Sequence, residues 1–85
     1  MVYEVKFTPS ADRTLNRLDL QDQRRIILRV EELAVNPRPP GVKKLAGPGD
    51  LWRIRVGDYR VIYQINDDIL LVLIVTVGHR GDVYR

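Results

Sequence analysis

The sequence predicts an α+β domain in which two helices pack on one face of a small, mainly antiparallel sheet. Three observations carry this prediction. Apolar residues alternate with polar ones near the N-terminus, recur at helical spacing up to residue 35, and alternate again over residues 51–63, before an apolar run from Ile69 to Val77. The predicted order is therefore strand, helix, helix and then an antiparallel meander of three strands, with an optional fourth.

Length and composition restrict the class of protein. The 85 residues suffice for one hydrophobic core, so we expect a single domain over residues 1–85. An apolar fraction of 45% favours a folded protein over a disordered one. The absence of cysteine excludes disulfides, thiolate chemistry and zinc sites built on cysteine. With no signal peptide and no apolar run long enough to span a bilayer, the chain is predicted to be cytosolic, without a membrane partner.

The first predicted elements are a strand and a helix. Tyr3, Val5 and Phe7 alternate with charged residues, as in a strand with one buried face. Thr8 followed by Pro9 is typical of an N-cap and a first helical residue. We therefore expect a short amphipathic helix of about three turns. Its apolar residues are Ala11, Leu15 and Leu18.

A second helix is predicted to begin after Asp19, whose side chain can cap it. It must end near Asn36, because Pro37 disfavours helical geometry at the residue before it. The buried stripe of this helix is predicted from helical spacing. Its members are Leu20, Gln23, Ile27, Val30 and Ala34, widened by Ile26 and Leu33.

A β-hairpin follows the connector over residues 38–41 and a Gly-Pro-Gly loop. Residues 51–56 and 59–63 alternate on either side of Gly57-Asp58, which is typical of a two-residue type I′ or II′ turn. Such a turn fixes the register of the strands. The predicted pairs are Val56 with Tyr59, Arg55 with Arg60, Ile54 with Val61, Arg53 with Ile62 and Trp52 with Tyr63.

The register divides the hairpin into an apolar face, predicted to be core, and a face that carries Arg53, Arg55 and Arg60. Arg55 opposite Arg60 is a like-charge pair, which normally destabilises a sheet. An anion at this face would explain that cost. The net charge is +3 and the whole excess lies in residues 38–85. Guanidinium groups bind phosphate through paired donors, so a phosphodiester backbone is the natural ligand.

The last predicted strand runs from Ile69 to Val77, after a turn at residues 66–68. It is apolar on both faces, so we expect it in the middle of the sheet with both faces covered, ending at Gly78. His79, the only histidine, is either a loop residue without a role or a proton carrier near neutral pH. Tyr84 is either an aromatic cap over the core edge or a phenol that exchanges a proton or stacks on a base.

Five strings in the second half of the chain carry a family resemblance. They are Lys44-Leu45-x-Gly47, Leu51-Trp52-Arg53-Ile54-Arg55, Asp58-Tyr59-Arg60-Val61-Ile62-Tyr63, Val77-Gly78-His79-Arg80 and Val83-Tyr84. Together with the leading strand and helix pair, they resemble the RelE toxin family over nearly the whole chain. The resemblance implies the RelE/ParE fold and the toxin of a bacterial or archaeal type II toxin–antitoxin module. It also implies a hetero-oligomer with a RelB-like antitoxin that blocks the toxin.

RelE-like toxins are ribosome-dependent endoribonucleases, so the resemblance implies an mRNA-cleaving enzyme that enters the decoding site. In this reaction the ribose 2′-hydroxyl attacks the adjacent phosphate, and translation is inhibited. The sequence has no metal-spaced cluster and no nucleotide-binding glycine motif, so we expect a metal-independent enzyme without a cofactor. The alternatives are a ParE-like inhibitor of DNA gyrase, which shares the fold, and a non-catalytic module that binds RNA or the antitoxin.

The family's functional positions fall on five residues of this sequence. Arg60 and Arg80 would clamp the scissile phosphate and stabilise the charge of its transition state. Tyr84 is the first candidate for the general base. Arg53 and Arg55 would hold the RNA, and because arginine effectively cannot lose its proton, neither is given an acid or base role.

Two lysines and the histidine are weaker candidates. Lys43 and Lys44 are most simply solvated, but near the hairpin they would extend a basic groove that binds RNA. His79 could supply acid–base function beside Arg80.

Overall fold

The computed structural model describes residues 2–47 and 49–79. The helices and the longer strands lie in the order predicted from the sequence. A short strand before the hairpin was not predicted, and an optional strand after the last one would lie outside the described residues. The elements are β1 (Glu4–Phe7), α1 (Pro9–Arg17), α2 (Leu20–Val35), β2 (Lys43–Lys44), β3 (Leu51–Val56), β4 (Tyr59–Asn66) and β5 (Leu71–His79).

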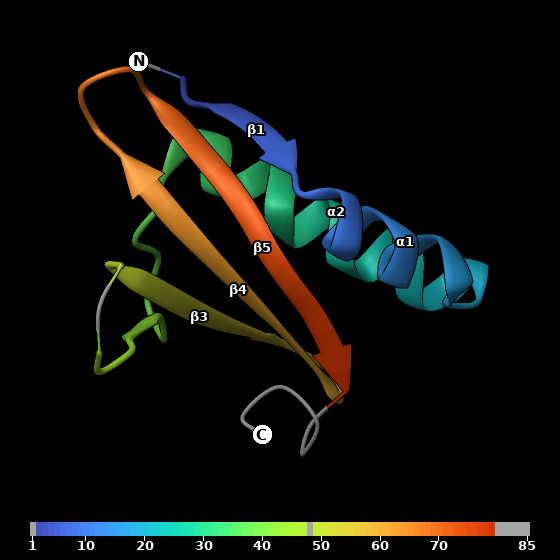
Figure 1. The fold of residues 1–85 in the computed structure, drawn as a ribbon. Helices are drawn as coiled ribbons and strands as arrows, with labels where there is room; N and C mark the ends of the chain where they lie inside the picture. The colour runs from blue at the N-terminus through green and yellow to red at the C-terminus, as the bar shows by residue number, and fades with distance from the viewer. Residues whose placement is uncertain (1, 48, 80–85) are drawn as a thin grey trace.

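The five strands form one sheet in the order β1-β5-β4-β3-β2. β1 pairs with β5 in parallel, and the other neighbouring strands are antiparallel. Both helices lie on the same side of the sheet (Figure 1), and their main contacts are with β1, β5 and β3. The predicted α+β architecture is confirmed. In the described part of the chain, no helix has both the length and the apolar character needed to cross a membrane.

The predicted helix caps are present. Thr8 Oγ1 accepts a hydrogen bond from the backbone N–H of Ala11 at 3.2 Å, and Pro9 is the first residue of α1. Asp19 Oδ1 accepts from the backbone N–H of Asp22 at 3.4 Å. α1 is shorter than expected, because Leu18 has left the helical conformation and caps the helix. These caps fix where each helix begins against the sheet.

The predicted buried stripe of α2 is wrong in part. Ile26, Val30 and Leu33 are buried, whereas Leu20 is 66% exposed and Ile27 is 38% exposed. Residues 26–28 are all apolar, so periodicity alone did not determine which face of the helix meets the sheet. Packing selected the face centred on Ile26, and the apolar side chains next to it point outward.

The predicted limits of the last strand also need correction. β5 starts at Leu71 rather than Ile69 and runs to His79, so Gly78 does not end it. Asn66 Oδ1 accepts from the backbone N–H groups of Asp68 and Ile69, which extends the turn to residue 70. β5 does lie inside the sheet, between β1 and β4. The helices cover only one of its faces.

The core lies between the helices and the sheet. Tyr63 is its largest fully buried side chain, and its hydroxyl donates to the carbonyl of Pro37 at 2.7 Å. Burial raises the pKa of Tyr63 to about 12, so the phenol stays protonated at neutral pH. The other fully buried side chains are Ile26, Leu33, Ile54, Ile74, Val61 and Val72.

A polar cluster at the β4–β5 turn gives the first prediction. Arg38 Nη2 donates to Asp67 Oδ2 at 3.0 Å, and the Tyr3 hydroxyl donates to Asp67 Oδ1. The hydrogen bonds from Arg38 and then Tyr3 lower the pKa of Asp67. A carboxylate with a lowered folded pKa stabilises the protein above its unfolded pKa of about 4, and this contribution is lost as pH falls through the folded value.

We therefore expect Asp67→Asn to lower the melting temperature at pH 7, with the difference from wild type shrinking towards pH 3. Thermal unfolding followed by circular dichroism at both pH values measures this. Asp68→Asn is the matched control, because the neighbouring Asp68 side chain has no ion pair in the described part of the chain. An equal loss at both pH values would contradict the assignment.

Candidate functional site

The β3–β4 hairpin has the register predicted from the sequence. Arg55 lies opposite Arg60, Arg53 lies opposite Ile62, and the three remaining predicted pairs are also present. Gly57 has a φ of 60° and Asp58 does not have a positive φ, which identifies the turn as type II′. A turn of this kind matches the twist of the strands and holds the two opposed arginines in place.

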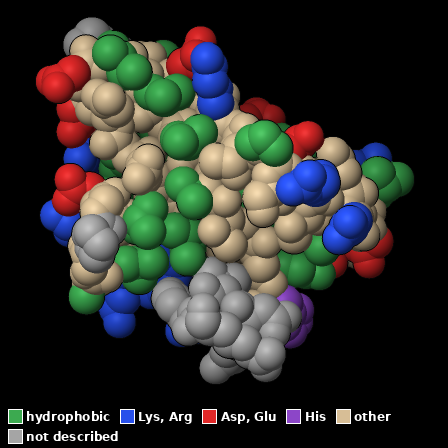
Figure 2. Space-filling model, viewed as in Figure 1, with side chains coloured by type: hydrophobic (Ala, Val, Ile, Leu, Met, Phe, Trp, Pro, Cys, Tyr) green, Lys and Arg blue, Asp and Glu red, His purple; other side chains and the backbone are tan. Residues whose placement is uncertain are grey.

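The three arginines lie on the face of the sheet that the helices leave open. Ile54, Val56 and Val61, which neighbour them along the strands, are buried in the core, so alternation directs the arginines to the other side. We call Arg53, Arg55 and Arg60 the arginine face. Hydrophobic side chains gather over the face of the molecule seen in Figure 2, with several Lys and Arg side chains nearer its edge.

The members of the arginine face differ in exposure. Arg55 is exposed and Arg60 is half-buried, whereas Arg53 is only 6% exposed. Arg53 lies between β2 and β4, and its Nε is buried without a hydrogen-bond partner among the described residues. Leaving a buried donor unsatisfied costs about 1–3 kcal/mol. An anion bound at this face would supply an acceptor and reduce that cost.

Arg55 is also connected to the helical layer through its backbone. Arg29 Nη1, on α2, donates to the Arg55 carbonyl at 3.4 Å, and Arg29 Nε lies 3.6 Å from Glu32 Oε2. This leaves the Arg55 guanidinium on the open side, directly across from Arg60. Two cations held at opposed positions repel each other. A polyanion that binds both guanidinium groups would offset this repulsion.

Of the two lysines, only one joins the arginine face. Lys43 pairs with Arg53 and therefore shares its side of the sheet. Lys44 pairs with Trp52 on the opposite side, where its Nζ lies 3.3 Å from Asp50 and 5.7 Å from the centroid of the Trp52 ring. The structure does not bring Lys44 to the predicted groove.

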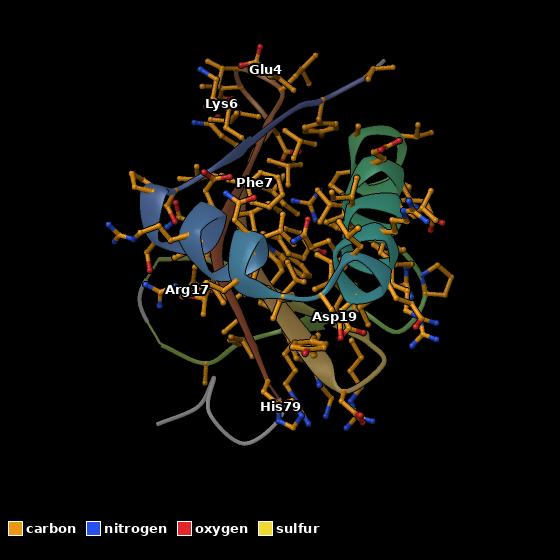
Figure 3. All side chains as sticks on the ribbon, turned by 90° about the vertical axis from the view of Figure 1, so that its right-hand side faces the viewer. Glu4, Lys6, Phe7, Arg17, Asp19 and His79 are labelled. Atoms are coloured by element: carbon orange, nitrogen blue, oxygen red, sulfur yellow. The ribbon has the colours of Figure 1, made fainter. Side chains whose placement is uncertain are left out.

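His79 is likewise on the side of the helices. It pairs with Tyr59, and the two rings meet edge to face with centroids 5.5 Å apart. The Tyr59 hydroxyl donates to Asp22 on α2 at 3.2 Å, and burial is the first cause of its raised pKa. Figure 3 shows His79 at the end of β5, at the same end of the molecule as Asp19. A proton carrier at His79 would act on the opposite face from Arg60.

Thr76 was not predicted from the sequence, but it lies on the arginine face. It pairs with Ile62, next to the Arg60–Gly78 pair, and is half-buried. An irregularity between Ile62 and Tyr63 shifts the register of β4 against β5. No sequence signal marks this bulge, because β5 does not alternate. Predicted site residues Arg80 and Tyr84 lie outside the described residues.

No group of three His, Asp or Glu side chains in residues 2–47 and 49–79 could hold a metal ion. Among these residues, the chemistry of the arginine face is that of fixed positive charge and hydrogen-bond donors. It can bind a phosphate and stabilise added negative charge on it.

Known proteins resemble this chain over most of its length. Residues 5–84 match the family described as the ParE toxin of type II toxin-antitoxin system, parDE. Toxin RelG of Mycobacterium tuberculosis is 37% identical over 93 residues, which cover 100% of this chain and 99% of that protein.

Solved structures agree with the sequence comparison. A chain of the archaeal RelE-RelB complex from Pyrococcus horikoshii OT3 has a TM-score of 0.85 and 36% identity, covering 96% of this chain and 99% of that one. A chain of the toxin-antitoxin complex RelBE2 from Mycobacterium tuberculosis has a TM-score of 0.84 and 30% identity, with coverage of 96% and 95%. The similarity therefore includes the sheet, both helices and the hairpin.

Proposed function

The chain belongs to the RelE/ParE superfamily of toxins from type II toxin–antitoxin systems, and we propose that it is a ribosome-dependent endoribonuclease that cleaves mRNA. The observation that carries this proposal is the arginine face. It places Arg55 opposite Arg60 and leaves a buried donor of Arg53 unsatisfied among the described residues. A phosphodiester supplies the negative charge and the acceptors that this arrangement lacks.

The proposed reaction is a transesterification within the RNA. The ribose 2′-oxygen forms a bond to the adjacent phosphorus, and the bond from phosphorus to the 5′-oxygen breaks. A base takes the 2′-hydroxyl proton, and the departing 5′-oxygen receives a proton. The products are a 2′,3′-cyclic phosphate and a 5′-hydroxyl end. Negative charge on the phosphoryl oxygens grows in the transition state, which is where preorganised cations accelerate the reaction.

The described residues divide between chemistry and binding. Arg60 is half-buried and set by the hairpin register, so we assign it to the scissile phosphate. Arg53, Arg55 and Lys43 hold the neighbouring backbone. Lys44 lies on the other side of the sheet and is left out of this set.

The remaining roles rest on the sequence. Arg80 is proposed as the second phosphate clamp and Tyr84 as the general base. His79, on the side of the helices, is left without a role in proton transfer.

Membership of this toxin family also indicates the partners of the chain. The structural relatives are RelE–RelB complexes, which supports a RelB-like antitoxin that forms a hetero-oligomer with this chain. The substrate is mRNA on the ribosome, and the site of action is the cytoplasm.

A gyrase-inhibiting toxin is the second candidate, favoured by the ParE description of the matching family. Controlled expression in a bacterial host separates the two functions. We expect primer extension to reveal new mRNA ends inside translated codons. Intact mRNA together with trapped gyrase–DNA cleavage complexes would favour the second candidate. Toxicity with neither signature would contradict both.

Arg55 and Lys44 offer a matched pair for testing which face binds RNA, because both are exposed cations, on the neighbouring strands β3 and β2 but on opposite sides of the sheet. A hydrogen bond from a charged donor contributes about 1.5–3 kcal/mol, so Arg55→Ala is expected to raise the concentration that halves translation by roughly 10-fold or more. Lys44→Ala is expected to change it less than about 2-fold. Dose–response curves in a purified translation reaction measure both, and equal effects would place the RNA elsewhere.

A further inference from the structure

α2 carries a second apolar stripe that faces away from the core. Leu20, Ile27, Leu28 and Val35 are 66%, 38%, 61% and 72% exposed. Large apolar side chains scattered singly over a surface need no explanation, but a row along one helix indicates a contact surface. We call these four residues the outer stripe.

Two opposite charges lie on the same face of the helix as the outer stripe. At helical periodicity, Arg24 and Glu31 fall between its apolar members. Neither side chain forms an ion pair within the described residues, whereas Arg29 and Glu32 on the same helix pair with each other. Figure 3 shows α2 along one side of the molecule, with many of its side chains directed away from the sheet. Arg24 and Glu31 are therefore available to a partner.

The sequence of this face is complementary to itself when two copies of α2 lie side by side in opposite directions. In an antiparallel pair of α2 helices, Leu20 lies opposite Val35, Arg24 opposite Glu31, and Ile27 opposite Leu28. All these pairs form at once around a two-fold axis between Ile27 and Leu28. A two-fold interface of identical chains requires this property, because every contact between two different residues occurs twice, once on each side of the axis.

We propose that the outer stripe of α2 is a homodimer interface, occupied by α2 of a second copy of this chain in antiparallel orientation. The apolar pairs leave water, and each of the two symmetry-related Arg24–Glu31 pairs joins opposite charges. In a parallel pair, Arg24 would meet Arg24 and Glu31 would meet Glu31, so the charges select the antiparallel arrangement.

A neighbouring cavity extends the apolar surface. It has a volume of about 490 Å³ and lies between β1 and α2. Ile27, Glu31 and Val35 belong both to its lining and to the face described above, and Val2, which is 68% exposed, lines it as well. A copy docked on α2 would cover the rim of this cavity and bury more apolar area than two helices alone.

The interface is small. A helix of 16 residues is about 24 Å long, and one such pair lies at the low end of specific interface sizes. We therefore expect a weak dimer whose population rises with concentration and whose charged pairs are weakened by salt.

Charge reversal tests the pairing directly. Arg24→Glu, Glu31→Arg and the double variant are compared with the parent chain by sedimentation velocity between about 5 and 500 μM. All carry Arg60→Ala to limit toxicity to the expression host, and Arg13→Glu on α1 is the control for a change of net charge. Far-UV circular dichroism verifies that each variant is folded.

Each single reversal is expected to weaken dimerisation at least 10-fold, because it opposes like charges. The double variant restores the dimer, and an equimolar mixture of the two single variants forms a heterodimer. A parent chain that stays monomeric over the whole range overturns the proposal and leaves the stripe to another partner, such as the antitoxin. A dimer that both reversals leave unchanged also overturns it. Neither result depends on whether the chain cleaves RNA.

Discussion

Arg60→Ala is expected to reduce mRNA cleavage by about 10²–10³-fold, the cost of removing one preorganised donor from a developing oxyanion. Arg60 is half-buried on β4, opposite Arg55. The side chain is therefore held in place before the reaction starts. Its positive charge would meet the phosphoryl oxygens where the transition state gains charge. The rate of mRNA cleavage on isolated ribosomes, measured under single-turnover conditions, tests this result.

Two companion variants make the Arg60 result specific. Arg60→Lys retains the charge but loses the paired donors, so we expect it to recover only part of the rate. Arg17→Ala, an exposed residue at the end of α1, should cleave at the wild-type rate. If Arg60→Ala keeps a melting temperature close to that of wild type, the loss is chemical. A wild-type rate in Arg60→Ala would remove Arg60 from the proposed site.

Ile26→Ala is expected to destabilise the fold by about 2–5 kcal/mol, whereas Ile27→Ala costs less than about 1 kcal/mol. Ile26 is fully buried and its truncation leaves a cavity between α2 and the sheet, while the adjacent Ile27 is 38% exposed. Domains of this size are stable by only about 5–10 kcal/mol, so the first loss approaches unfolding.

Urea denaturation measures both free energies of unfolding. Low micromolar protein concentrations keep the proposed α2 dimer from stabilising the parent chain, because the stabilisation that association provides depends on protein concentration. Equal losses from Ile26→Ala and Ile27→Ala would contradict the observed orientation of the helix. A larger loss from Ile27→Ala would support the orientation that periodicity alone favoured.

The sequence alone predicts the β3–β4 hairpin, including which residues of the two strands face each other. Its strands alternate strictly, and a two-residue turn permits only one register for them. Strand alternation alone therefore places the side chains of Arg53, Arg55 and Arg60 on one face, in agreement with the observed pairing. The burial of Arg53 was not predictable, because it depends on what lies beside β3 rather than on β3 itself.

The orientation of α2 and the start of β5 could not be obtained from periodicity. α2 has apolar residues on two faces, and the one that packs is selected by the sheet, which lies elsewhere in the sequence. β5 does not alternate, so its register depends on the bulge in its pairing with β4. Assigning Lys44 and His79 to the side of the helices required those strand pairings, which their local sequence does not encode.

The most direct test of the proposed function compares one mRNA in two states. The purified chain is incubated with that mRNA bound to programmed ribosomes and, separately, with the naked transcript, and the ends are mapped at nucleotide resolution. We predict cleavage inside the codon at the decoding site, with a 5′-hydroxyl on the downstream product, and intact naked RNA. Cleavage of both forms at similar rates, or no cleavage of either, would contradict the proposed function.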